Sequence, residues 1–329
     1  MQIATYVRLA AGIAAACAAA LQPAAAAGPA DDYPAKPIRM IVPFPAGQPT
    51  DTLARTIGAE IGTLAGQTVV VENKPGANAA IGAMQVARAQ PDGYTLLFGS
   101  NSPMAGNMAL FKKPAYDAVA DFDPVALVSQ TGWMIAVRTG SPYKTIQDLV
   151  EAARKAPGTL SIGGGTTGYQ MAATIVGKNA NAPFTVIPYN GTPQLVTDVL
   201  GGHVDAISAD VGTIGKLVDS GAMRALVAMT PQRVSHFPDV PTLKESGYGE
   251  VKLMFSWMGM FAPAGTPRDI REKLAGLVQQ AMDSDNAKKY MLEQRMDPSF
   301  VASEAFRELQ KQDIENYRAA MQYTGTQAQ

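Results

Sequence analysis

From Pro37 onward, short apolar runs alternate with amphipathic segments whose apolar residues recur every three to four positions. The run 37–44 has the composition of a buried strand, and 52–66 has the pattern of a helix. Such an alternation is typical of α/β units with mostly parallel sheets. The chain is therefore predicted to open with a β-α-β-α-β unit. The further segments of this unit are 67–76, 79–93 and 94–103.

A second α/β unit follows in the middle third, after a helix that Thr145 is expected to cap together with Asp148. Two long apolar runs, 125–138 and 251–267, flank this unit, and each is expected to cross between lobes. The C-terminal helices, the last of them capped by Ser303, have no strands of their own and are expected to cover the first unit. We predict an α/β two-lobe protein with two inter-lobe crossings, in which helices flank a mostly parallel sheet in each lobe. Residues 31–138 and 255–329 form lobe 1, and residues 139–254 form lobe 2.

Residues 1–27 have the order of a secretory signal peptide, with Arg8 before an apolar run and small residues at the end. The run is too short and too rich in alanine for a membrane span. Cys17 could be a lipoprotein attachment site, but Ala14 stands where such sites usually carry leucine. We therefore favour cleavage and a location in the periplasm. Cleavage would remove the single cysteine, which excludes disulfide, zinc-thiolate and cysteine-nucleophile chemistry.

The charge balance and the histidines exclude several functions. The formal net charge is -1, so no basic surface for nucleic acid is expected. His203 and His236 lack the spacing to other ligands that a metal site needs. Serine-hydrolase, zinc-protease and phosphate-loop motifs are absent. We expect no catalytic residue, cofactor or metal; an enzyme with Asp205 or Asp210 as a base remains an alternative that lacks a nucleophile–base pair.

The first of two strand–turn–helix junctions that could bind a ligand is 43–51, which reads PFPAGQPTD. Its prolines stiffen the path, and Gly47 allows a ligand to approach the backbone closely. Thr50 or Asp51 is expected to cap the helix that follows, so that free N–H groups and the positive helix end face the turn. An anion such as a carboxylate is favoured at such a place.

The second junction has the pattern G-x-G-x-x-G at 163–168, between a predicted strand and a predicted helix. A dinucleotide fold would need an acidic residue about 20 positions further on. There is none between Glu151 and Asp198. The backbone N–H groups and the hydroxyls of Thr166 and Thr167 suit a smaller anion.

Other polar side chains stand at the ends of predicted strands, where ligands bind in open α/β sheets. Any one of them alone would be explained by a capping or turn hydrogen bond. Their occurrence at equivalent places in two lobes favours a shared ligand site. The candidate ligand-binding residues are Phe44, Ala46, Gly47, Gln48, Thr50, Asp51, Ser100, Asn101, Gly165, Thr166, Thr167, Gly168, Tyr189, Asn190, Asp205 and Asp210.

Five segments, in order, resemble the Bug-type extracytoplasmic solute receptors, the TctC-like substrate-binding proteins of tripartite tricarboxylate transporters. The segments are 33–55, 71–100, 188–210, 237–248 and 261–267. The resemblance implies a type II-like periplasmic binding protein that closes on a small organic acid or amino acid. In this chain the acid would lie between the turns 43–51 and 163–168. The membrane subunits of the transporter are the implied partner, with the receptor a monomer; a periplasmic sensory protein is the alternative.

Three departures from the family pattern concern the ligand. Gln48 and Pro49 stand where flexible glycines are common, Tyr169 and Gln170 where a histidine often follows, and Asn190 where a lysine is usual. The loss of a positive charge favours a monocarboxylate, or an amide-bearing or aromatic acid, over a highly charged ligand. The Gln48–Pro49 pair adds a side-chain amide and removes a backbone N–H, so it is expected to influence which acid binds.

Overall fold

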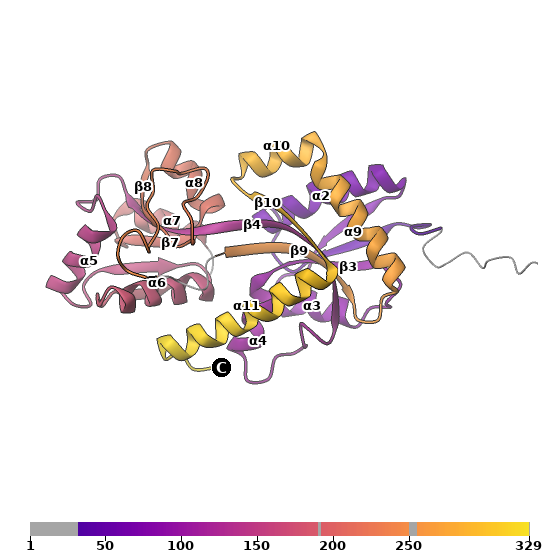
Figure 1. Cartoon of the computed structure of the whole chain (residues 1–329), viewed down its shortest axis with the longest axis horizontal. Coiled ribbons are helices and arrows are strands. Elements are labelled where there is room, and N and C mark those ends of the chain that lie inside the picture. Colours follow the sequence, from indigo (N-terminus) through magenta and orange to yellow (C-terminus); the bar gives the residue numbers. More distant parts are fainter. Residues whose placement is uncertain (1–31, 190–191, 250–254, 329) are drawn as a thin grey trace, which may run out of the picture.

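The computed structural model describes residues 32–189, 192–249 and 255–328. The predicted signal peptide with Cys17, and the candidate residue Asn190, lie outside these ranges. None of the described helices combines the length and the hydropathy of a membrane span. Two groups of helices and strands lie side by side, and the long strands β4 (Phe122–Arg138) and β9 (Phe255–Pro263) run between them (Figure 1).

Lobe 1 contains a mixed sheet in the order β2-β1-β3-β9-β4, with β10 also paired to β4. β1 pairs in parallel with β2 and β3, whereas β9 is antiparallel to both β3 and β4. Because side chains alternate across a strand, Met40 and Ile41 of β1 join separate apolar clusters on the two faces. The elements are β1 (Ile38–Val42), α2 (Pro49–Ala65), β2 (Val69–Asn73), α3 (Ala80–Ala87), β3 (Thr95–Ser100), the π-helix η1 (Ser102–Gly106), α4 (Asn107–Leu110), α9 (Arg268–Asp283), α10 (Asp285–Glu293), β10 (Asp297–Ala302) and α11 (Ser303–Thr324).

Lobe 2 continues the same sheet through β4-β7-β5-β6, and β8 also pairs with β4. β5 is parallel to β6 and β7, whereas β7 and β8 are antiparallel to β4. Thr145 and Asp148 form the predicted capping box at the start of α5. The elements are α5 (Ile146–Lys155), β5 (Ser161–Gly164), α6 (Thr167–Asn179), β6 (Thr185–Pro188), α7 (Thr192–Gly201), β7 (Ala206–Asp210), α8 (Val211–Asp219) and β8 (Met223–Ala228).

The predicted two-lobe α/β fold is confirmed, but the sheets are mixed rather than mostly parallel. Among the described strands, the parallel ladders join β1, β2 and β3 in lobe 1 and β5, β6 and β7 in lobe 2. The chain leaves lobe 1 on β4 and returns on β9, and an outgoing strand that pairs with a returning strand must be antiparallel. The C-terminal helices were predicted to have no strand among them, but strand β10 lies between α10 and α11. Pro298 and a register shift interrupt the alternation of side chains that would mark β10 as a strand in the sequence.

The two crossings and α11 connect the lobes. Within β4, residues up to Gly132 pair with β9, and residues from Trp133 pair with β7. The chain thus enters the sheet of lobe 2 before residue 138, the end of lobe 1 in the prediction, and the lobe boundaries remain a prediction. α11 packs on lobe 1 through Phe306 and runs on to contact α6 of lobe 2 (Figure 1). Ser303 does not cap α11; its hydroxyl donates to the carbonyl of Val125, 3.3 Å away.

Candidate functional site

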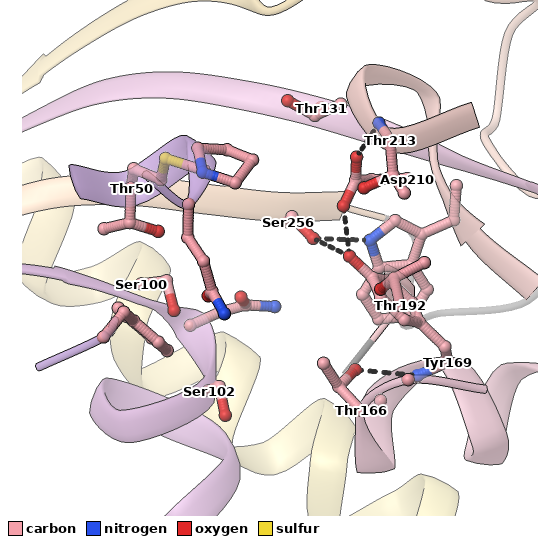
Figure 2. Close-up of a pocket in the computed structure, with 18 of the residues that line it drawn as sticks. Thr50, Ser100, Ser102, Thr131, Thr166, Tyr169, Thr192, Asp210, Thr213 and Ser256 are labelled. Atoms are coloured by element: carbon pink, nitrogen blue, oxygen red, sulfur yellow. Dashed lines mark hydrogen bonds between the residues drawn. The ribbon is translucent and has the colours of Figure 1, made fainter. Parts of the chain in front are cut away.

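A cleft with a volume of about 690 Å³ is lined by both lobes and by the crossing strands (Figure 2). Lobe 1 contributes the start of α2 and the end of β3, and lobe 2 contributes the starts of α6, α7 and α8. Strands of both lobes thus end at the cleft, which is where ligands bind in open α/β sheets. The candidate residues that line the cleft are Phe44, Gly47, Gln48, Thr50, Ser100, Asn101, Gly165, Thr166, Thr167, Gly168 and Asp210.

Other candidate residues lie outside the cleft lining. The Tyr189 hydroxyl donates to Asp198 Oδ2 at 2.6 Å. Asp205 Oδ2 accepts from the backbone N–H and the hydroxyl of Ser161, each at 2.8 Å, and so joins β5 to the residue before β7. Ala46 is exposed but does not line the cleft. These three candidates are therefore not among the residues that line the cleft.

The helix of the first turn starts earlier than predicted. α2 begins at Pro49, and Gln48 is its N-cap without a side-chain capping bond, so neither Thr50 nor Asp51 is the N-cap residue. Proline fits this first position because its missing N–H would have had no partner within the helix. Asp51 therefore occupies the third helical position. The N–H groups of Thr50 and Asp51 have no acceptor within α2.

Asp51 holds the turn in shape rather than lining the cleft. Its side chain is 2% exposed, Oδ2 accepts from the Gly47 N–H at 2.8 Å, and Oδ1 accepts from Asn73 Nδ2 at 2.8 Å. Asn73 Nδ2 also donates to the carbonyl of Phe44 at 3.0 Å. Burial by itself would raise the pKa of Asp51, but hydrogen bonds from Arg55, Gly47 and Asn73 outweigh it and lower the pKa. The carboxylate thus uses the Gly47 N–H, and the Thr50 N–H is left for a ligand.

The second turn has an equivalent arrangement at the start of α6. Thr166 is the N-cap, and its hydroxyl accepts from the Tyr169 N–H at 3.4 Å. The N–H groups of Thr167 and Gly168 therefore have no acceptor within the helix. A Cβ at Gly168 would lie 2.9 Å from the Tyr317 hydroxyl, so the lobes approach here too closely for a larger residue.

A hydrogen-bonded network forms one wall of the cleft (Figure 2). The Tyr169 hydroxyl donates to Asp210 Oδ2 and lies 3.2 Å from the Ser256 hydroxyl, which accepts from Trp133 Nε1 at 2.8 Å. Asp210 Oδ1 accepts from the Thr213 N–H at 2.7 Å and so caps α8. Burial, with the nearby Asp210 charge, raises the pKa of the Tyr169 hydroxyl well above its usual value. Tyr169 therefore stays a neutral donor to Asp210.

Asn101 connects three elements at the base of the cleft. Its Nδ2 donates to the carbonyl of Phe255 at 3.1 Å and to the Tyr317 hydroxyl at 3.2 Å. These bonds join the end of β3 to β9 and α11. Asn101 is 5% exposed, so its amide group acts mainly in holding the crossing strand and α11 in place.

Further residues from the crossing strands, from α11 and from other helix starts line the cleft and were not predicted from the sequence. A search of all helix starts in lobe 2 could have found Thr192 and Thr213. The remaining lining residues have no sequence motif that would mark them as part of a site, because the residues that lie next to them in the fold are distant in the sequence. Among the described residues, no three His, Cys, Asp or Glu side chains form a group that could hold a metal ion. The additional lining residues are Pro49, Ser102, Gly106, Leu110, Thr131, Trp133, Tyr169, Thr192, Pro193, Val196, Thr213, Lys216, Leu217, Ser256, Met258, Met296 and Tyr317.

Two α/β lobes joined by crossing strands around a cleft define a solute-binding protein. The model of the family described as tripartite tricarboxylate transporter family receptor, TctC, matches residues 53–325. The chain belongs to this family, whose receptors are periplasmic. It is similar to Protein BugT of Bordetella pertussis, with 31% identity over 90% of this chain and 91% of BugT.

Solved structures show the same architecture. The periplasmic binding protein BugD matches with a TM-score of 0.78 and 32% identity, over 90% of this chain and 100% of BugD. An R. palustris protein solved with adipate matches with a TM-score of 0.81 and 26% identity, over 89% of this chain and 99% of that protein. The family and the fold are thus those of solute-binding receptors.

Proposed function

We propose that this protein, as a periplasmic monomer, captures a small carboxylate between its lobes and presents it to the membrane subunits of a tripartite tricarboxylate-type transporter. One observation carries the proposal: a helix of each lobe begins at the same cleft, α2 at Pro49 and α6 at Thr167. The binding of adipate by a protein of similar fold supports a carboxylate as the ligand. The role is binding without chemical conversion.

The two helix starts favour an anion for the same physical reason. Each presents backbone N–H groups without acceptors and the positive end of a helix dipole, equivalent to about half an elementary charge. The hydroxyls of Thr50, Ser100 and Thr167 line the same cleft and can donate further hydrogen bonds. A carboxylate has two oxygens, so one oxygen can accept from each lobe.

A ligand bound in this way stabilises the closed arrangement of the lobes, because it contacts both. In the open arrangement one set of contacts is lost, so the ligand shifts the population toward the closed state. The closed state is the form that a membrane subunit can distinguish from the empty receptor.

The test is a thermal-unfolding screen of the purified mature protein against a panel of organic acids and amino acids, adipate included. A ligand at about 100 times its Kd is expected to stabilise the folded state by about 2.7 kcal/mol. Thr50→Val should weaken binding of the best acid by roughly 5- to 10-fold through loss of one hydrogen bond. Thr63→Val, on the same helix but outside the cleft lining, is the matched control. If no acid raises the melting temperature, the proposal is wrong.

A further inference from the structure

The charges of the cleft are few and are arranged to disfavour a second anionic group. Among the described lining residues, Asp210 and Lys216 are the charged ones. Both oxygens of Asp210 are occupied, by the Tyr169 hydroxyl and by the Thr213 N–H, and neither donor is a cation. The negative charge of Asp210 therefore remains at the wall of lobe 2. A second carboxylate of a ligand near this wall would be repelled.

The one cation of the described lining lies at the solvent-exposed rim. The Lys216 side chain is exposed, and Nζ donates to Gln294 Oε1 at 3.3 Å. Solvent and salt screen a charge in such a position. Lys216 therefore compensates poorly for a second anionic group deeper in the cleft.

The aromatic side chains of the wall have their polar atoms engaged by other protein groups. Trp133 Nε1 donates to Ser256, and the Tyr169 hydroxyl donates to Asp210. The two rings meet edge to face, with centroids 5.1 Å apart and an interplanar angle of 82°. Both residues are buried, so this wall offers a ligand no donor from either side chain that lacks a protein partner.

Apolar side chains from both lobes complete this part of the cleft. Phe44 and Leu110 of lobe 1 and Val196 and Leu217 of lobe 2 line the cleft and are half-buried. They retain exposed surface that a ligand can cover, and apolar surface removed from water contributes to affinity. Met258 and Met296 also line the cleft, and thioethers contact aromatic rings favourably.

We propose that the ligand of this receptor is an aromatic monocarboxylate, with a single carboxylate group and an uncharged ring. The carboxylate binds at the starts of α2 and α6. The ring packs among the half-buried side chains of Phe44, Val196 and Leu217. This inference rests on the proposed function and specifies its ligand class.

Calorimetric titration with 3-phenylpropanoate and with adipate separates the two ligand classes. Adipate has its second carboxylate where the other acid carries its phenyl ring. 3-Phenylpropanoate is expected to bind at least about 10-fold more tightly, because the ring covers apolar surface. Equal or tighter binding of adipate would overturn the inference and leave the carboxylate receptor intact. If 3-phenylpropanoate does not bind, the inference is wrong; if no acid of the wider panel binds, the proposed function is wrong as well.

Two substitutions test the placement of the ring. Val196→Thr keeps the side-chain shape and is expected to weaken 3-phenylpropanoate about 5-fold, and adipate less than about 2-fold. Val70→Thr, on the exposed edge strand β2, is the matched control and should change neither Kd. Lys216→Met should leave the Kd of 3-phenylpropanoate within about 3-fold, since solvent screens this charge. A loss of about 10-fold or more in Lys216→Met, or an unchanged Kd in Val196→Thr, would contradict the placement.

Discussion

The first turn of the cleft depends on the buried carboxylate of Asp51, and Asp51→Asn removes its charge while keeping its shape. Asp51 is 2% exposed and accepts from Gly47 and Asn73, each at 2.8 Å, and from Arg55 Nε at 3.2 Å. Asparagine keeps one acceptor oxygen and turns an NH₂ group toward the other donor. Either the Gly47 N–H or the Asn73 amide then loses its partner.

The expected loss of stability follows from these contacts. A buried donor without a partner costs about 1–3 kcal/mol, and the remaining hydrogen bond loses its charge assistance. The Arg55 side chain is 48% exposed, so its ion pair adds less than about 1 kcal/mol. We expect Asp51→Asn to lower the free energy of unfolding by about 3 kcal/mol, which corresponds to a melting temperature roughly 5–10 °C lower.

The pH dependence of this effect has a definite sign. Burial would raise the pKa of Asp51, but hydrogen bonds from Arg55, Gly47 and Asn73 outweigh it, so the folded-state pKa is lowered. Stability from such a carboxylate is complete above its unfolded pKa of about 4 and is lost as the pH falls through the folded value. The difference between wild type and Asp51→Asn should be constant from about pH 5 to pH 8 and shrink below about pH 4.

The assay is thermal unfolding followed by circular dichroism at several pH values, together with a Kd for the best acid of the panel. Asp51→Asn is expected to weaken binding, because Gly47 and Thr50 are no longer held in place. The control is Asp148→Asn, which removes the capping box of α5 outside the cleft lining and should lower stability without changing the Kd. A melting temperature of Asp51→Asn within about 1 °C of wild type at pH 7 would refute the reasoning.

Three further predictions concern α11 and the contacts between lobes. Burial raises the pKa of Asp313 to about 7, although a hydrogen bond from Trp257 lowers it, so stability falls as the pH rises from about 4 to about 7. Asp313→Asn should therefore be about 4 kcal/mol more stable than wild type at pH 8 in urea unfolding, with no difference near pH 4. Equal stability at pH 8 would contradict this. Gly168→Ala puts a Cβ 2.9 Å from the Tyr317 hydroxyl of α11, so the two lobes can no longer approach as closely, and the ligand Kd should rise at least about 10-fold. A Kd equal to that of wild type would show that Tyr317 moves aside without cost. Arg295 of lobe 1 forms an ion pair with the half-exposed Asp219 of lobe 2, so Arg295→Ala should raise the ligand Kd only about 3- to 5-fold. The radius of gyration of the ligand-free protein, measured by X-ray scattering, should increase. An unchanged radius would argue against a role of this ion pair in closure.

The fold was predictable where local pattern determines structure. The apolar run after Pro37 predicts β1. Gly66 predicts the end of α2, because glycine readily adopts the left-handed conformation that this residue has at the end of the helix. The antiparallel pairing of β4 with β9 was not predictable in this way, because it joins residues more than a hundred positions apart. β10 was missed because Pro298 and its bulge break the alternation that marks a strand.

The helix starts that line the cleft could be predicted from the sequence, whereas the hydrogen-bonded network of its wall could not. Turns 43–51 and 163–168 have local signatures, and both line the cleft. The role of Asp51 was harder to predict. The helix starts at Pro49, three residues before the predicted start at 52, so Asp51 is not the N-cap but lies within the first helical turn, where it accepts hydrogen bonds that hold the turn 43–51 in shape. Tyr169 was noted only as a departure from the family pattern. Its role depends on Asp210, Ser256 and Trp133, which only the folded chain brings together.

The central claim, that one carboxylate binds at two helix starts, is tested most directly by amide hydrogen exchange at single-residue resolution. The protein would be measured alone and with the tightest-binding acid of the panel. The account predicts that exchange slows together at the N–H groups of Thr50 and Asp51 in lobe 1 and of Thr167 and Gly168 in lobe 2, because these donors have no acceptors within their helices. Protection at one lobe alone, or at neither, would contradict it.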